Sequence, residues 1–146
     1  MREILFRGKM DNGEWVYGSF CMDALEQFNG LCGVDGFIRL YDKAKGKIQT
    51  YEVDRETVGQ YTGLKDKHGK RIFEGDIVAQ NWYDYDEPRD DSFGKVVFCE
   101  YDCSFSVMDV NKDGFMPLGR CGSYHWEVEV IGNIHDNQEL LKGGDG

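Results

Sequence analysis

The chain has 146 residues, of which 40% are hydrophobic and 14% aromatic, which excludes a disordered protein and suffices for a core without disulfides or metal ions. No apolar run could span a membrane and the N-terminus lacks a secretory signal, so we expect a cytoplasmic protein with no membrane partner. The net charge of −10 makes nucleic acid an unfavourable general ligand.

Short strands separated by turns dominate the first part of the chain. Asn12-Gly13 is typical of a hairpin turn, and a second hairpin is predicted around residues 43–46. A short helical turn is predicted at 22–28, where apolar residues recur at every third position. The predicted strands are 2–10, 14–20, 37–42, 47–53 and a short extended piece at 57–62.

The second part opens with a polar hairpin tip that ends in glycine, followed by two short strands around a Glu74-Gly75-Asp76 turn. Residues 81–92 are rich in acidic side chains and contain Pro88, so we interpret them as an exposed loop. A third hairpin, a half-buried strand and a final helical turn are predicted at 95–100 with 104–110, at 126–130 and at 135–141.

The close spacing of strands and turns predicts a mainly β protein, β-rich α+β in class, built from short-stranded hairpins. We expect a single domain over residues 1–146, with an N-terminal β lobe at 1–56. An SH3-like small barrel is predicted for the second half, at 57–142, and a flexible tail at 143–146.

Several sequence pieces recur together in one known family. They are Arg2-Glu3-Ile4-Leu5-Phe6-Arg7, Tyr61-Thr62-Gly63-Leu64-Lys65-Asp66, His68-Gly69-Lys70, Ile72-Phe73-Glu74-Gly75-Asp76-Ile77-Val78, Gly94-Lys95-Val96-Val97-Phe98 and Glu129-Val130-Ile131-Gly132-Asn133-Ile134-His135. In this order they resemble the YopX family, small proteins of unknown function found mainly in bacterial phages and prophages. The resemblance implies a phage or prophage origin, hence a bacterial host cell, and a tendency to self-assemble. It implies no activity and no functional residues.

The glycines and aspartates of these pieces have structural explanations. Gly63, Gly69 and Gly75 fall at predicted turns, where glycine adopts left-handed backbone angles cheaply. Asp66 and Asp76 can accept hydrogen bonds from backbone N–H groups of the turns. We therefore assign these positions to the fold.

Five cysteines are an odd number, and in a cytoplasmic protein we expect reduced thiols. Cys99, Cys103, Cys121 and His125 have a spacing that zinc sites use, which keeps a zinc site as the alternative. The acidic segment 84–91 lacks the ligand pattern of a calcium loop. We expect no metal and no cofactor.

Catalytic signatures are missing from the sequence. No nucleophile motif or phosphate-binding glycine loop is present, so we expect no catalytic residues. A small hydrolase-like enzyme that uses His125 or His135 beside a carboxylate stays open, because catalytic residues can assemble in space.

The charge distribution suggests an interaction function. Residues 1–73 carry a balance of +1 and residues 74–146 a balance of −11. We expect a homo-oligomer whose basic tip meets the acidic segment of a neighbouring copy; the residues are Lys65, Lys67, Lys70 and Arg71 on one side and Asp84, Asp86, Asp90 and Asp91 on the other. The alternative is an acidic regulator or decoy that binds a host protein that handles nucleic acid.

Overall fold

The computed structural model describes residues 2–21, 36–112, 114–119 and 124–142. Strands dominate these residues, which confirms the mainly β prediction. The chain divides into two compact units, Met1–Tyr61 and Thr62–Gly146, and each is described by itself. The predicted helical turn at 22–28 and tail at 143–146 lie outside the described residues.

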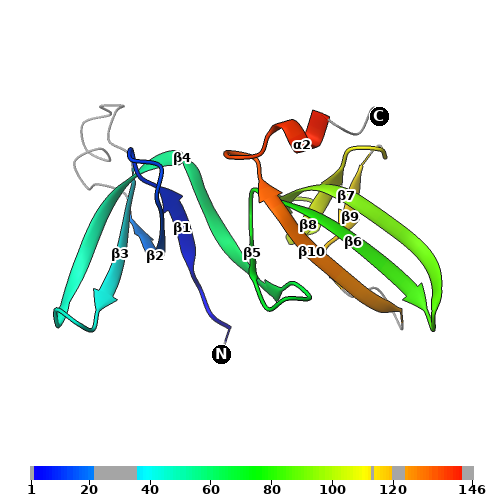
Figure 1. The fold of residues 1–146 in the computed structure, drawn as a ribbon, viewed down its shortest axis with the longest axis horizontal. Helices are drawn as coiled ribbons and strands as arrows, with labels where there is room; N and C mark the ends of the chain where they lie inside the picture. Colours follow the sequence, from blue (N-terminus) through cyan, green and yellow to red (C-terminus); the bar gives the residue numbers. More distant parts are fainter. Residues whose placement is uncertain (1, 22–35, 113, 120–123, 143–146) are drawn as a thin grey trace. The chain divides into compact units, whose positions relative to one another are not determined.

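The first unit is an antiparallel arrangement of four strands (Figure 1). The pairings run from β1 through β2 and β3 to β4, and β4 also pairs with β1, although the resulting ring is not clearly closed. Both predicted hairpins are confirmed. The strands are β1 (Phe6–Lys9), β2 (Trp15–Cys21), β3 (Gly36–Asp42) and β4 (Lys47–Lys65).

Strand β4 is a single strand of 19 residues, so the predicted extended piece at 57–62 is confirmed and is continuous with the strand predicted at 47–53. Its first part pairs with β3 and its next part with β1. The register shifts between Arg7 and Lys9, where the Thr57 hydroxyl accepts a 2.8 Å hydrogen bond from the Lys9 N–H and donates one of 2.6 Å to the Asp54 carbonyl. The hydroxyl therefore replaces the backbone partners lost at the shift.

The second unit is built on a five-stranded antiparallel sheet in the order β10-β6-β7-β8-β9 (Figure 1). Strand β5 pairs with the end of β4. The elements are β5 (Arg71–Phe73), β6 (Asp76–Asp84), β7 (Glu87–Cys99), β8 (Ser104–Asp109), β9 (Phe115–Pro117), β10 (His125–Asn133) and the short helix α2 (Glu139–Lys142).

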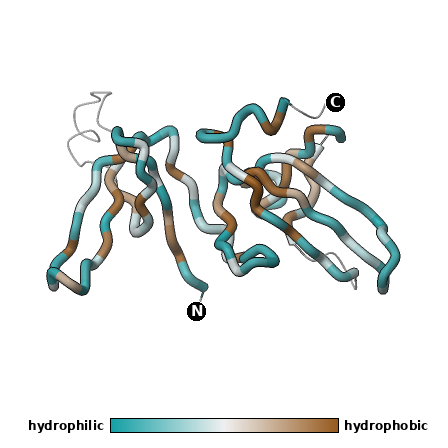
Figure 2. The backbone as a smooth tube through the Cα atoms, in the orientation of Figure 1, coloured by the Kyte–Doolittle hydropathy of each residue, from teal (hydrophilic) through white to brown (hydrophobic). Residues whose placement is uncertain are grey.

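A small apolar core fills one face of this sheet. Its buried members are Ile72, Val78, Val96, Val107 and Val128, which come from five different strands. Each such side chain stabilises the fold by about 1.5–3 kcal/mol relative to exposure. Figure 2 shows the polar turn at 66–70 as strongly hydrophilic, in contrast to the hydrophobic strand segments of the core.

The SH3-like barrel predicted for this half is not seen as a ring of paired strands, because β10 and β9 are the two edges of the described sheet. Side chains connect these edges instead. The buried Gln80 amide accepts a 2.9 Å hydrogen bond from the Trp126 indole N–H and donates to the Ser92 hydroxyl at 2.8 Å and the Pro117 carbonyl at 3.0 Å. Polar side chains of the core therefore bridge from β10 through β6 to β9.

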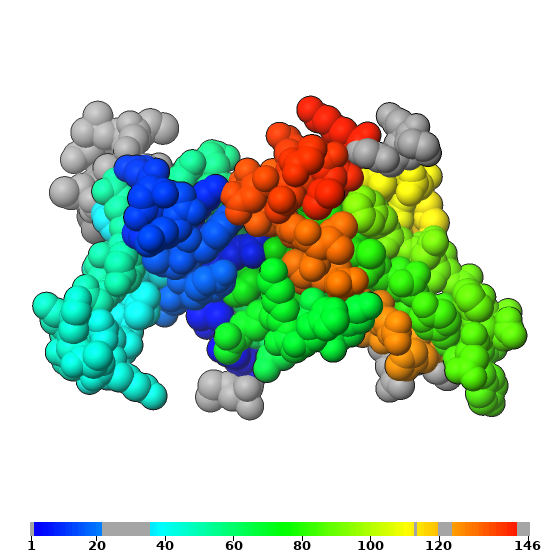
Figure 3. All heavy atoms as spheres, in the orientation of Figure 1, coloured from blue at the N-terminus to red at the C-terminus, as the bar shows by residue number. Residues whose placement is uncertain are grey.

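The acidic segment 81–92, predicted as a loop, is the outer part of the β6–β7 hairpin. Backbone pairing continues to Asp84 opposite Glu87. The strands persist because Trp82 and Ser92, which are 3% and 4% exposed, anchor them from the core side. The predicted exposure of residues 85–91 is confirmed, and Figure 3 shows this hairpin end projecting beyond the neighbouring strands of the unit.

Candidate interaction surfaces

The basic tip is an ordered turn built on one carboxylate. Oδ1 of Asp66 accepts hydrogen bonds of 2.9 Å from the N–H groups of His68 and Lys70, and Oδ2 accepts one of 3.1 Å from Val130. Gly69 has a φ of +83°, which only glycine adopts without strain. The predicted structural roles of Asp66 and Gly69 are thus confirmed.

The electrostatics of Asp66 follow from these contacts. Burial by itself would raise the pKa of this carboxyl, since it disfavours the charged form. The hydrogen bonds from Val130, Lys70 and His68 outweigh burial and hold the pKa below its ordinary value of 3.8. The Asp66 carboxylate is therefore ionised, and hydrogen bonds from backbone N–H groups stabilise its charge.

The basic side chains of the tip differ in their surroundings. Lys67 and His68 both lie beside Glu129 of β10, at 3.5 Å and 3.4 Å. Lys65 and Lys70 are exposed, and neither forms an ion pair within the described part of the chain. Arg71 is exposed at the start of β5. Two of the basic residues thus have charges that no acidic side chain of the described chain offsets.

The acidic hairpin has a similar division. Asp84 forms a 2.9 Å ion pair with Arg89, and Asp90 forms one of 2.7 Å with Lys112. By contrast, Asp86 and its neighbour Glu87 at the turn are exposed and form no ion pair with any described residue. The turn itself is therefore the part of this hairpin with unbalanced charge.

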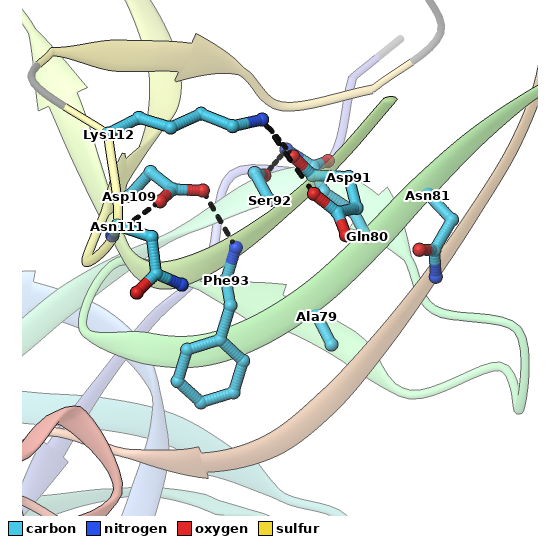
Figure 4. Close-up of a pocket in the computed structure, with 9 residues that line it drawn as sticks. All are labelled: Ala79, Gln80, Asn81, Asp91, Ser92, Phe93, Asp109, Asn111 and Lys112. Atoms are coloured by element: carbon cyan, nitrogen blue, oxygen red, sulfur yellow. Dashed lines mark hydrogen bonds and ion pairs between the residues drawn. The ribbon is translucent and has the colours of Figure 1, made fainter. Parts of the chain in front are cut away.

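Side chains also complete the edge of β7 where β8 ends (Figure 4). The Asp109 carboxylate accepts a 3.0 Å hydrogen bond from the Phe93 N–H, and the Lys112 ammonium donates to the Asp91 carbonyl. These are the backbone groups that a longer β8 would pair with. Asp109 and Lys112 thus occupy the place of the missing strand.

Lys112 also forms an ion pair with the Asp90 carboxylate, and this contact shifts the pKa of both groups. The hydrogen bond from Lys112 lowers the pKa of Asp90, against a smaller opposing effect of burial. The reciprocal hydrogen bond raises the pKa of Lys112. Both side chains are partly exposed, so solvent weakens this ion pair.

A polar cavity of about 150 Å³ lies beside this edge (Figure 4). Its lining includes Asp91 and Asp109 together with the amides of Asn81 and Asn111. These oxygens are ligands that hard cations prefer, but the Lys112 ammonium already supplies the positive charge among them. Among the described residues, no group of three or more His, Cys, Asp or Glu side chains is arranged to hold a metal ion.

Among the described residues of the alternative zinc site, His125 is not brought together with Cys99 and Cys103. His125 pairs with Tyr83, which pairs with Pro88 at the start of β7. Cys99 is at the far end of that strand, about 35 Å from Pro88 as measured along an extended strand at the usual rise per residue. Cys103 lies in the turn after Cys99, and Cys121 is outside the described residues.

The two histidines of the enzyme alternative lie on the surface. His125 is exposed, with its ring 3.4 Å from Glu127. His135 is exposed in the turn after β10. Neither histidine lines the polar cavity beside Lys112.

Three groups of the second unit were missed by sequence reasoning: the Gln80 bridge, Asp109 and Lys112. Gln80 leaves no signal of its own in the sequence, because its burial becomes visible only in the structure. Asp109 and Lys112 leave none, because their partners are 16 and 21 residues away and are backbone groups.

Within the described residues, no helix has the length and apolar character needed to cross a membrane. Residues 5–142 match the family model described as YopX protein. A crystal structure of protein EF1440 from Enterococcus faecalis is similar, with 26% identity, coverage of 97% of this chain and 99% of that chain, and a TM-score of 0.53. No curated protein matches the chain.

Proposed function

The chain belongs to the YopX family, and from that premise we propose that it is a non-enzymatic interaction module that associates with further copies of itself in the bacterial cytoplasm. One observation carries the proposal. The chain displays a basic and an acidic hairpin end, both ordered, and each retains charges without an ion-pair partner in the described chain. Such complementary patches on one chain favour head-to-tail contacts between copies.

The ion pairs within the chain indicate which charged side chains are available to form ion pairs with another copy. Lys67 and Asp84 already have partners within the chain. Lys65 and Lys70 on the basic tip, and Asp86 with Glu87 on the acidic turn, have none among the described residues. We therefore place these four side chains at the centre of the contact, with Lys67, Arg71, Asp84, Asp90 and Asp91 around it.

Charge reversal tests this contact directly. We expect Lys65→Glu with Lys70→Glu, or Asp86→Lys with Glu87→Lys, to weaken self-association at least about tenfold, because attraction becomes repulsion. An equal mixture of the two variants restores the opposite charges, and we expect it to associate again. Native mass spectrometry and sedimentation at two salt concentrations measure the species present.

The matched control is Lys43→Glu with Lys45→Glu, which reverses two exposed lysines at the β3–β4 turn. This variant should associate as the natural chain does. Higher salt should loosen the assembly, since exposed charges are screened beyond about 10 Å at 0.1 M. A monomeric natural chain, or an oligomer that neither salt nor charge reversal affects, would contradict the proposal.

A further inference from the structure

Two cysteines share the turn between β7 and β8. Cys99 is the last residue of β7 and pairs directly with Ser104, the first residue of β8. Cys103 immediately precedes Ser104 in the chain. Residues directly opposite in an antiparallel pair have Cα atoms about 4.5–5.5 Å apart, and here these are Cys99 and Ser104. Cys103 is the residue next to Ser104, so residues 100–102 alone separate the two cysteines at the closed end of this hairpin.

Both sulfur atoms lie against the turn itself. The Cys99 thiol is 3.9 Å from the Asp102 carboxylate, and the Cys103 thiol is 3.5 Å from the Glu100 carbonyl oxygen. The two thiols differ in access, since Cys99 is buried and Cys103 is exposed. An exposed thiol beside a buried one is the arrangement in which the first reacts with an external reagent and the second resolves the product.

Cys103 has an unusual backbone conformation for a residue with a side chain. Its φ is +52°, a left-handed conformation that a residue with a Cβ atom adopts at a cost and that glycine or asparagine adopts readily. Cys103 thus occupies a position that its backbone conformation does not favour.

We propose that Cys99 and Cys103 form an oxidisable dithiol, which a low-molecular-weight disulfide such as oxidised glutathione converts into a disulfide across the β7–β8 turn. This modification site is independent of the self-association proposed above. It uses two of the cysteines considered for zinc and needs neither Cys121 nor His125. The cross-link would close the turn between β7 and β8, whose register pairs Cys99 with Ser104, the residue after Cys103.

The reaction has two exchange steps. The Cys103 thiolate attacks one sulfur of oxidised glutathione, forming a mixed disulfide and releasing one glutathione thiolate. The Cys99 thiolate then attacks the Cys103 sulfur of that mixed disulfide, and the second glutathione leaves. The protein loses two protons and two electrons, which convert one molecule of oxidised glutathione into two of the reduced form.

The test is a thiol count on the full chain. The reduced protein is incubated with oxidised glutathione and, separately, with the cationic disulfide cystamine, because Glu100 and Asp102 repel an anionic reagent. Free thiols are then blocked with N-ethylmaleimide in denaturing urea, because Cys99 is buried in the folded chain. We expect an intact mass lower by two hydrogens before blocking, two fewer maleimide labels, and a peptide map that joins Cys99 to Cys103. Dithiothreitol should restore both labels.

Cys103→Ser is the matched variant, since its side chain is exposed and the substitution leaves the core unchanged. In this variant Cys99 should keep its maleimide label after either oxidant. Three results on the natural chain would overturn the proposal. These are full labelling of both cysteines, a stable mixed disulfide on Cys103, and pairing of Cys103 with Cys21, Cys32 or Cys121.

Discussion

The Asp66 carboxylate accepts a hydrogen bond of 3.1 Å from the backbone N–H of Val130, a residue 64 positions further along the chain. The same carboxylate closes the turn at residues 66–70 through two further backbone hydrogen bonds. The N–H of Lys67 donates in turn to the Val128 carbonyl at 2.9 Å. One side chain thus shapes the basic tip and fixes it to β10.

Removal of this carboxylate should therefore destabilise the protein. We expect Asp66→Ala to lower the free energy of unfolding by about 3 kcal/mol, because three backbone N–H groups lose their acceptor. Urea denaturation measures the change. Asp11→Ala, at an exposed aspartate of the β1–β2 turn, is the control and should stay within about 0.5 kcal/mol. Equal effects of the two substitutions would contradict this role.

The same site should make stability depend on pH. The pKa of Asp66 is lower in the folded chain than its ordinary value of 3.8, so the ionised group stabilises the fold. That contribution is fully present above pH 3.8 and is lost as the pH falls through the lower folded value. We expect the natural chain to lose more stability than Asp66→Asn does on acidification from about pH 5 to about pH 2. Parallel stability curves would refute the assignment.

Gln80 gives a second test in the core. We expect Gln80→Leu to cost about 3 kcal/mol in free energy of unfolding, because the Trp126 indole N–H and the Pro117 carbonyl lose their buried partner. Gln138→Leu, at an exposed glutamine, should be nearly neutral. The near-ultraviolet circular dichroism of the tryptophans offers an independent readout of the Trp126 environment, and an unchanged spectrum with unchanged stability would rule out the bridge.

Gly94 is required by the close approach of β7 and β8. A Cβ atom at this position would lie 1.9 Å from the Met108 carbonyl oxygen, so Gly94→Ala must displace the paired backbone. We expect a loss of about 3 kcal/mol or more. Gly46→Ala has no atom within 4 Å of the new Cβ but a φ of +66°, and should cost only about 1 kcal/mol. Thermal unfolding of both variants distinguishes a clash from backbone strain.

Tyr85 offers a substitution that should stabilise the protein. This residue is 92% exposed and has a φ of +57° in the β6–β7 turn. We expect Tyr85→Gly to raise the free energy of unfolding by up to about 1 kcal/mol, because the left-handed strain disappears. Tyr101→Gly is the matched control, since Tyr101 is 98% exposed and is not among the residues with positive φ. That variant should be neutral or slightly destabilised.

Local patterns were sufficient to predict the class of fold and most hairpins. The Asn12-Gly13 turn and the alternation in 126–130 depend on neighbouring residues, and the structure has a hairpin and a strand there. The turn at 66–70 was likewise visible, because glycine and aspartate have conformational preferences of their own. Such features need no knowledge of distant residues.

Two differences between the predicted and the observed elements share one physical cause. The acidic composition of 81–92 favours a loop, but Trp82 and Ser92 are anchored in a core that the local sequence does not reveal. Likewise, the extended piece at 57–62 belongs to β4 because β1, far away in the chain, pairs with it. Long-range pairing overrides local propensity in both places. The Gln80 bridge needs partners up to 46 residues apart, which no local pattern specifies.

The use of Asp109 and Lys112 to complete the edge of β7 has a consequence for synthesis on the ribosome. Strand β7 leaves the ribosome before Asp109 and Lys112 do. Strand β10, the last strand of the chain, follows later and pairs with β6 on the other side of the β6–β7 hairpin. At about 5–20 residues per second, the hairpin spends seconds with open backbone edges. Pro88, Asp90 and Asp91 lie on that edge, and proline and charged residues discourage pairing with another nascent chain. The same acidic residues that lie exposed in the folded hairpin are therefore expected to disfavour misassembly of the growing polypeptide.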